Sequence, residues 1–437
     1  MKNSLFFKEC KQIVRSIPFL VYAVVLLLFF LAQYESDLVK VEKPQPGKSS
    51  YGMKISDDLK IIEPAAVKSL YGEFVLNSYT AYPIGFYKNV KLNAGQQREM
   101  AGVLSELTGN SAEQFLNATK DASSALTVNG GNMTKNEDGS YSIGSSGTEE
   151  ADKTTDSLIN TVKSNLSADR FHSLMRQADK LIGGGSFYGD TYLSRFGEVP
   201  KSYEDALSDY NDIVKKDGIT GAYARYFCDY LGIVLALFPV FLAVASGMKD
   251  RRAGMRDLIY SRRISSAKIV LTRYIAQIII LFLPILLLAV YSTAQVAAEY
   301  PGFELHWLAF IGYSFGWLLP TLMISASVGT VTTELTDAPI GIVVQGLWWF
   351  LGLFSGVAHI DGGYGWDLIL RHNTVGNTQV YLDNFSILLW NRTAYTAFAL
   401  VLIVSTIVVY ERKRRGKWNA YFGFRKNSKH HRVQSAT

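Results

Sequence analysis

Residues 230–248 read YLGIVLALFPVFLAVASGM and contain no Asp, Glu, Lys, Arg or His. At about 1.5 Å per residue, a helix of this length can cross the roughly 30 Å hydrocarbon core of a lipid bilayer. The segment that follows, residues 249–273, carries eight basic and two acidic side chains. An apolar run next to a basic segment is typical of a membrane span whose basic end lies in the cytoplasm.

Five more apolar runs of similar length lie elsewhere in the 437-residue chain. They are residues 16–34, 274–298, 305–333, 338–360 and 393–410. The mean hydropathy of the whole chain is only +0.10, because these runs are averaged with long polar segments. The six runs exclude a soluble protein and predict an all-α membrane protein with six transmembrane helices.

The distribution of charge predicts how these spans are oriented. The net charge is +3 before the first span, −6 between the first and second, +6 at residues 249–273 and +8 beyond the last. Because Lys and Arg are retained in the cytoplasm, both termini are expected there and residues 35–229 are expected outside the cell. Glu334 and Asp337 are an exception, since this count places two acids on the inside. The overall net charge of +6 is therefore a topology signal and does not indicate a nucleic-acid partner.

The two cytoplasmic ends differ in pattern. Residues 1–15 are predicted to form an amphipathic helix at the membrane surface, with a short basic tail as the alternative. Residues 411–437 are predicted to be a basic tail. The first span, residues 16–34, could instead be a cleaved signal peptide, but Phe30 stands where a cut after Ala32 needs a small residue. We therefore expect this segment to remain as transmembrane helix 1.

Residues 35–229 are predicted to form an extracellular domain inserted between the first span and residues 230–410, which hold the other five. Apolar residues recur there at helical spacing, so the domain is expected to be mainly α-helical. Residues 123–150 are rich in Gly, Ser, Asn and Thr and predict a long loop or a small hairpin. The four helical stripes are Met100, Val103, Leu104 and Leu107; Leu158, Val162 and Leu166; Leu174, Ala178 and Leu181; and Tyr203, Leu207, Tyr210 and Val214.

The chain contains only two cysteines, Cys10 and Cys228, which the predicted topology places at opposite membrane faces. A domain of this size outside the cell would therefore fold without a disulfide. That is ordinary for a bacterial surface protein and unusual for a eukaryotic one, so we expect a bacterial, Gram-positive source.

No pattern for catalysis or metal binding occurs in the chain. Residues 47–49 read Gly-Lys-Ser, as at the end of a phosphate-binding loop, but Glu42 stands where the leading glycine is required. His430 and His431 lie in the basic tail without Cys or His partners nearby in sequence. The chain is therefore predicted not to be an enzyme and to hold no cofactor of its own.

The interiors of the predicted spans carry no Asp, Glu, Lys or Arg, which argues against ion-coupled transport. Gly312 and Gly316 have the GxxxG spacing that lets helices approach closely, and close packing is the simpler explanation for them. Polar and aromatic residues near mid-membrane are candidates for a substrate path, with lipid-facing or packing roles as the alternative. These candidates are Gln277, Gln345, Trp348 and Trp349.

The cytoplasmic segment after the second span contains Asp250, Gly254, Leu258, Ser261, Ile264 and Ser265, followed by Arg273. At these positions the segment resembles the first intracellular loop of ABC type-2 export permeases. The family more often has Glu at position 250, and Pro at position 263, where this chain has Arg. The resemblance implies that this loop contains a short coupling helix that docks on an ATPase subunit. A solvated basic loop is the alternative.

The resemblance and the layout together predict the membrane permease subunit of an ATP-driven exporter. ATP and Mg²⁺ would bind to separate ABC ATPase subunits, and a second permease chain, identical or related, would complete the transporter. Walls without charge favour an apolar or amphipathic substrate such as a lipid, drug or antimicrobial peptide. The alternative is a membrane-anchored receptor or scaffold with passive spans.

Overall fold

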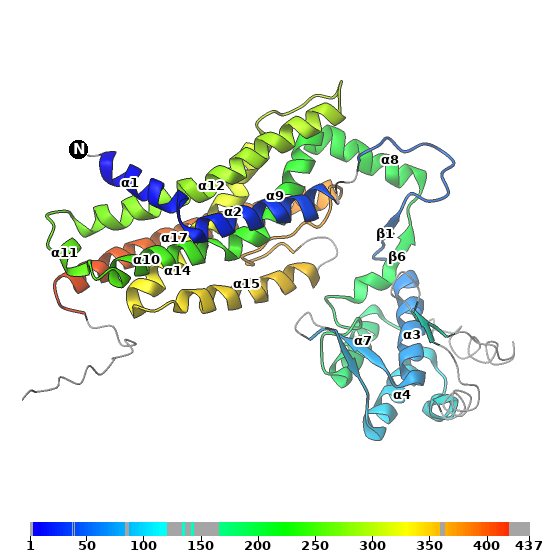
Figure 1. Ribbon diagram of the computed structural model, residues 1–437. Helices are drawn as coiled ribbons and strands as arrows, with labels where there is room; N and C mark the ends of the chain where they lie inside the picture. Colours follow the sequence, from blue (N-terminus) through cyan, green and yellow to red (C-terminus); the bar gives the residue numbers. More distant parts are fainter. Residues whose placement is uncertain are drawn as a thin grey trace, which may run out of the picture. The chain divides into compact units, whose positions relative to one another are not determined.

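The computed structural model describes residues 3–36, 38, 40–83, 87–119, 133–135, 141–143, 166–358 and 363–418. The chain divides into two compact units. The first, here called the helix bundle, comprises Met1–Glu42, Asp209–Val357 and Asp361–Thr437. The second, here called the inserted domain, comprises Lys43–Ser208 together with Ala358–Ile360. Figure 1 shows helices in both units, and the expected all-α membrane fold is confirmed.

Three of the predicted apolar runs in the helix bundle, residues 230–248, 274–298 and 393–410, lie inside longer helical stretches. Two short helices, α11 (Arg256–Tyr260) and α16 (Thr378–Asp383), lie in its loops. The others are α1 (Asn3–Val14), α2 (Ile17–Phe29) with the π-helix η1 (Phe30–Glu35), α9 (Ile219–Leu237), α10 (Pro239–Arg252), α12 (Ser266–Glu299), α13 (Ala309–Tyr313) with the π-helix η4 (Ser314–Leu318), α14 (Leu319–Thr336), α15 (Ile340–Ala358) and α17 (Phe385–Arg414).

Within the described residues, five helical stretches are long and apolar enough to cross a membrane, and α15 contains a shorter apolar stretch over Ile340–Leu353. The five are Ile17–Glu35, Ile219–Arg252, Ser266–Glu299, Ala309–Thr336 and Phe385–Arg414. The predicted limit between domain and span at Asp229 falls inside α9. The predicted last span, which starts at residue 393, begins eight residues later than α17, which starts at Phe385. Asp229 and Arg392 made both predicted runs begin too late, because every charge was taken as the end of a span, whereas these two side chains are buried inside helices.

Helix α14 packs against both α10 and α17, and most of its residues are buried. Its middle turns are made of small residues, among them Ser325, Ala326 and Gly329, which are buried. A Cβ atom at Gly329 would lie 2.8 Å from Cβ of Ala243 and 3.0 Å from the carbonyl oxygen of Val240. Position 329 therefore requires glycine, because the backbone of α14 there lies directly against Ala243 and Val240 of α10.

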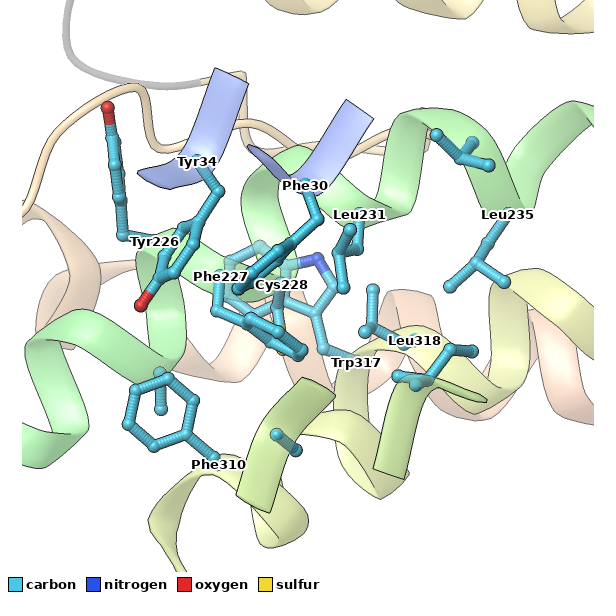
Figure 2. Packing of buried hydrophobic residues seen from close by; sticks show 14 of the residues in the cluster. Phe30, Tyr34, Tyr226, Phe227, Cys228, Leu231, Leu235, Phe310, Trp317 and Leu318 are labelled. Atoms are coloured by element: carbon cyan, nitrogen blue, oxygen red, sulfur yellow. The ribbon is translucent and has the colours of Figure 1, made fainter. Parts of the chain in front are cut away.

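An aromatic cluster joins η1, α9 and α13, as Figure 2 shows. The rings of Phe30 and Tyr34 in η1 stack at 5.1 Å, and Tyr34 meets Phe227 edge-on at 5.6 Å. Phe227 in turn meets Phe310 at 5.6 Å. Edge-to-face pairs at such distances add about 0.5–1.5 kcal/mol each beyond the burial of their area.

The inserted domain has a helical core with three short strand pairs. Its helices are α3 (Leu59–Leu76), α4 (Ala94–Thr108), a helix at residues 112–119, α7 (Ala168–Ile182) and the 3-10 helix η2 (Leu193–Gly197). The antiparallel pairs are β1 (Met53–Ile55) with β6 (Glu198–Pro200), β2 (Tyr79–Ala81) with β3 (Lys88–Val90) and β4 (Met133–Lys135) with β5 (Tyr141–Ile143). The last pair is the small hairpin expected within residues 123–150. Helix α8 (Tyr203–Asp212) and the π-helix η3 (Ile213–Asp217) follow.

The predicted helical stripes of this domain have different outcomes. The stripe on α4 is fully buried, and in α7 Leu174 and Ala178 are buried while Leu181 is half-buried. The stripe on α8 and η3 is only half-buried, although it is helical as predicted. Leu158 and Val162 lie outside the described residues.

Candidate functional site

The loop between α10 and α12 forms a tight turn followed by the short helix α11. Helix α10 ends at Arg252, and Gly254 adopts a left-handed φ of +65° that favours glycine. The N–H of Met255 donates to the carbonyl oxygen of Asp250 at 2.9 Å, which closes the turn. At the other end, Oγ of Ser265 accepts from the N–H of Lys268 at 3.3 Å and caps α12. The predicted coupling loop is thus a defined turn–helix–cap unit.

Helix α11 has one face against the bundle and one face in the open. Ile259, Tyr260 and Ile264 are half-buried, and they pack on a cluster that includes residues of α12 and α17. Leu258 is 52% exposed and Met255 is 44% exposed. The same segment carries the exposed charged residues Asp257, Arg262 and Arg263, and exposed apolar side chains in such a polar segment form the kind of surface that a partner protein covers.

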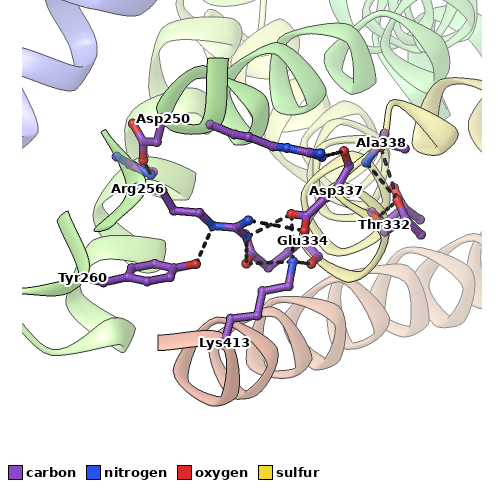
Figure 3. A network of polar contacts seen from close by, with 11 residues as sticks. Asp250, Arg256, Tyr260, Thr332, Glu334, Asp337, Ala338 and Lys413 are labelled. Atoms are coloured by element: carbon purple, nitrogen blue, oxygen red, sulfur yellow. Dashed lines mark hydrogen bonds and ion pairs between the residues drawn. The ribbon is translucent and has the colours of Figure 1, made fainter. Parts of the chain in front are cut away.

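Two acidic residues at the end of α14 hold this loop in place, as Figure 3 shows. Arg256 donates to both carboxylate oxygens of Asp337, at 2.9 Å through Nη2 and 3.3 Å through Nη1. Lys413 of α17 donates to the same carboxylate at 2.9 Å and lies 3.5 Å from Glu334. Burial acts to raise the pKa of Asp337, but hydrogen bonds from Arg256 and Lys413 outweigh it and lower the pKa. The two acids that were exceptions to the charge pattern are therefore the counter-ions of basic residues.

The last turn of α17 holds the second half of the loop. Arg414 donates to the carbonyl oxygen of Tyr260 at 2.9 Å, and its two terminal nitrogens donate to those of Ile264 and Arg262, each at 2.5 Å. Glu411 accepts a short hydrogen bond from the hydroxyl of Ser266. In the sequence these basic residues were counted only as a topology signal. The carbonyl groups that Arg414 contacts lie far away in the sequence; Ile264, for example, is 150 positions before it. No local sequence pattern could therefore reveal these contacts.

The first half of the loop is linked to the N-terminal helix α1. Arg273 of α12 pairs with Asp250 at 2.7 Å and with Glu9 at 3.2 Å. Lys249 donates to the other oxygen of Glu9 at 2.6 Å. Ile13 is buried in the bundle core, and the half-buried Phe6 and Cys10 pack against it. Helix α1 is amphipathic as predicted, and its buried acid connects it to the loop. We call the residues Glu9, Asp250, Arg256, Arg273, Glu334, Asp337, Lys413 and Arg414 the loop-anchoring network.

The residues predicted to line a substrate path lie in two separate places. Gln277 faces a cavity of about 50 Å³ beside the loop-anchoring network, which Asp250, Arg273 and Glu334 also line. Gln345 donates to the carbonyl oxygen of Ala236 at 2.6 Å. Two neighbours on α15 are also engaged: Trp349 donates to the carbonyl oxygen of Ile233 at 2.9 Å, and the ring of Trp348 lies 5.8 Å from that of Tyr395. The α15 residues thus attach that helix to α9 and α17.

At the opposite end of the bundle lies a group of buried charges that sequence reasoning missed. Arg225 is fully buried and pairs with Asp217, and its other terminal nitrogen donates to the carbonyl oxygens of Val375 and Gly376 at 2.8 and 3.0 Å. The guanidinium also lies 4.8 Å from the ring centre of Tyr381. Burial raises the pKa of Asp217, although Arg225 acts to lower it.

Asp229 is the centre of a second buried group. It pairs with Arg371 at 3.0 Å and accepts from the backbone N–H groups of His372 and Asn373, both at 2.9 Å. The ring of His372 contacts the hydroxyl of Tyr364 at 2.6 Å, and burial lowers its pKa to about 3, so it is neutral at ordinary pH. These contacts attach residues 363–377 to α9. A search for uncharged runs could not find them, because it treats every charge as the end of a span.

The fold and this site define a multi-pass helical membrane protein that carries a short loop helix anchored by ion pairs at one end of its bundle. Among the residues that the structure describes, no group of His, Cys, Asp or Glu is arranged to hold a metal ion. The chain belongs to the ABC-2 family transporter proteins, whose family model matches residues 13–361. It is the membrane permease component of an ABC transporter, is not itself the catalytic subunit, and by its family is expected to associate with an ABC ATPase. No curated protein and no solved structure matches the chain.

Proposed function

We propose that this permease is the membrane subunit of an ATP-driven exporter that moves an apolar or amphipathic substrate, such as a lipid, drug or antimicrobial peptide, out of the cell. ATP and Mg²⁺ would bind and react on separate ATPase subunits. The observation that carries the proposal is helix α11, which exposes Leu258 and Met255 while three neighbouring helices hold its other side.

In this proposal α11 is the coupling helix, and the loop-anchoring network transmits its movement. A displacement of α11 would act on α14 through the pair Arg256–Asp337. It would act on α17 through Arg414 and on α12 through the pair Asp250–Arg273. Charge-assisted hydrogen bonds are short and directional, so a movement of the loop would shift the helix ends with it.

The orientation follows from the charge pattern. Both termini and α11 would be cytoplasmic, and residues 35–229, including the inserted domain, would be extracellular. Two permease chains, identical or related, would form the transporter in the membrane lipid. The inserted domains would then gate the exit or receive the substrate.

The test is ATP hydrolysis by the complex of the full chain with an ABC ATPase subunit that co-purifies with it, reconstituted in lipid vesicles. We expect Leu258→Asp to reduce permease-dependent ATPase activity about tenfold or more, because it places a charge in an apolar contact. The matched control is Met53→Asp in β1, a similarly exposed apolar residue at 47%. If Leu258→Asp leaves the complex and its ATPase activity unchanged, α11 is not a coupling helix, and a receptor or scaffold with passive spans becomes the better explanation.

A further inference from the structure

A groove of about 470 Å³ lies between α13–η4 and the beginning of α17. One wall carries Gly312, Gly316 and Trp317, and the other carries Phe385, Leu389 and Arg392. Its volume is within the range of ligand sites, about 300–1,000 Å³. None of the residues that line it was predicted to lie on a substrate path.

The two glycines keep this groove open. A Cβ atom at Gly312 or Gly316 would meet no other atom within 4 Å, so their GxxxG spacing does not serve close packing inside the described chain. Phe385 and Leu389 on the facing wall are 47% and 58% exposed. Because α13–η4–α14 and α17 are both long and apolar enough to cross a membrane, we expect the open side of the groove to face the apolar interior of the membrane.

Arg392 introduces a positive charge into these apolar walls. It is 4% exposed and donates to Thr321 Oγ1 at 2.6 Å, to Asn391 Oδ1 at 3.0 Å and to the carbonyl oxygen of Trp317 at 3.2 Å. All of these acceptors are neutral, as are the remaining carbonyl acceptors, those of Leu368 and Asp367. Arg392 takes part in none of the ion pairs formed within the described ranges, and no acidic side chain is among the groove residues. These neutral acceptors satisfy the N–H donors of Arg392 but do not neutralise its positive charge. A nearby anion would stabilise this charge strongly, because the surroundings have a low dielectric constant.

We propose that this groove binds an acidic amphiphile with a single apolar chain, of the fatty-acid type. The chain would lie over Gly312 and Gly316 against Phe385 and Leu389. The carboxylate would lie toward Arg392, where charge complementarity favours it over a neutral head group. A groove of this volume suits one chain better than the two chains of a bilayer phospholipid.

This inference deepens the proposed export function by naming an acidic class of cargo. Binding is nevertheless measured on the permease alone. A failure of export or of ATPase coupling would leave the binding result standing, and a failure of binding would leave the coupling-helix test unaffected.

The experiment uses the full chain in vesicles of neutral phosphatidylcholine and follows tryptophan fluorescence. Dibromostearate quenches a tryptophan on contact, and Trp317 lies in the groove wall. We expect saturable quenching by dibromostearate, weaker quenching by its methyl ester and by dibromo-phosphatidylglycerol, and loss of the saturable component in Trp317→Phe. That variant separates the signal of Trp317 from that of the other six tryptophans of the seven in the chain.

Two variants test the groove itself. Gly316→Leu should fill it and weaken binding about tenfold or more, while Gly346→Leu on α15 should bind as the wild type, since a Cβ atom there also meets nothing within 4 Å. Arg392→Gln should abolish the preference for the acid over the ester. Equal binding to Gly316→Leu and the wild type would overturn the proposal. So would equal quenching by acid and ester, or tighter binding of dibromo-phosphatidylglycerol.

Discussion

Arg256 of helix α11 and Asp337 at the end of α14 form a two-point ion pair, with Nη2 to Oδ1 at 2.9 Å and Nη1 to Oδ2 at 3.3 Å. Asp337 ends α14 in a left-handed conformation with a φ of 57°. The turn that stops α14 therefore also supplies the carboxylate that holds the loop helix. Lys413 of α17 shares this carboxylate, so three segments far apart in the sequence meet at one side chain.

Asp337→Asn should weaken coupling without breaking the turn. Asn tolerates the left-handed conformation, but it carries no charge for Arg256 and Lys413. We expect a loss of about 1–3 kcal/mol in stability and a several-fold drop in permease-dependent ATPase activity. Thermal unfolding and ATP hydrolysis measure the two effects. Asp205→Asn, which breaks the exposed pair with Lys54, is the control and should change neither. Unchanged ATPase activity in Asp337→Asn would contradict a transmitting role for this pair.

His372 should make the stability of the bundle depend on pH. Burial holds the pKa of its ring to about 3, whereas an unfolded histidine titrates near 6.5. The unfolded chain therefore binds a proton that the folded chain does not, and the stability from this group is complete above about pH 6.5 and decreases as pH falls toward about 3. Unfolding temperatures between neutral and mildly acidic pH should fall less steeply in His372→Asn than in the wild type. His306→Asn, at an exposed histidine, should leave the slope as it is. Equal slopes in His372→Asn and the wild type would refute this.

Arg371→Met should be strongly destabilising, because it leaves the carboxylate of Asp229 buried without its ion-pair partner. Such losses are about 3–5 kcal/mol. The double variant Asp229→Asn with Arg371→Met should recover part of that loss, since both charges are removed. A thermal unfolding series over the wild type, both single variants and the double variant measures the coupling. Additive effects in the double variant would mean that the pair contributes little.

Glu9→Gln should loosen helix α1. The variant removes the charge that pairs with Lys249 and Arg273, so the attachment of α1 to the loop depends on packing by Ile13 and its neighbours. We expect faster amide hydrogen exchange across Asn3–Val14 with little change in the rest of the bundle. Lys11→Gln, on the exposed side of the same helix, is the matched control. Exchange that stays as slow as in the wild type would show that the ion pairs do not hold the helix.

The apolar helices and the buried face of α4 were predictable because they depend on properties that are local in the chain. Uncharged runs of membrane length identified the apolar helices, including α15, and the spacing of Met100, Leu104 and Leu107 identified the buried face of α4. Gly254 and Ser265 were expected in the loop, and they form its turn and its cap. Each of these features could be predicted from residues that are neighbours in the sequence, within one helical turn or one apolar run.

The sequence by itself determined that this chain is a multi-pass helical membrane protein with a basic loop after the second span, because hydrophobicity and net charge add up over neighbouring residues. Only the tertiary structure decided which charges are buried and what they hold. Arg256 and Asp337 are 81 positions apart, and Asp229 and His372 are 143 apart. A buried charge is stable only beside a partner, and where that partner lies depends on how the helices pack rather than on the residues next to it. For the same reason Asp229 and Arg392 marked the ends of predicted spans in the sequence but lie inside helices in the folded chain.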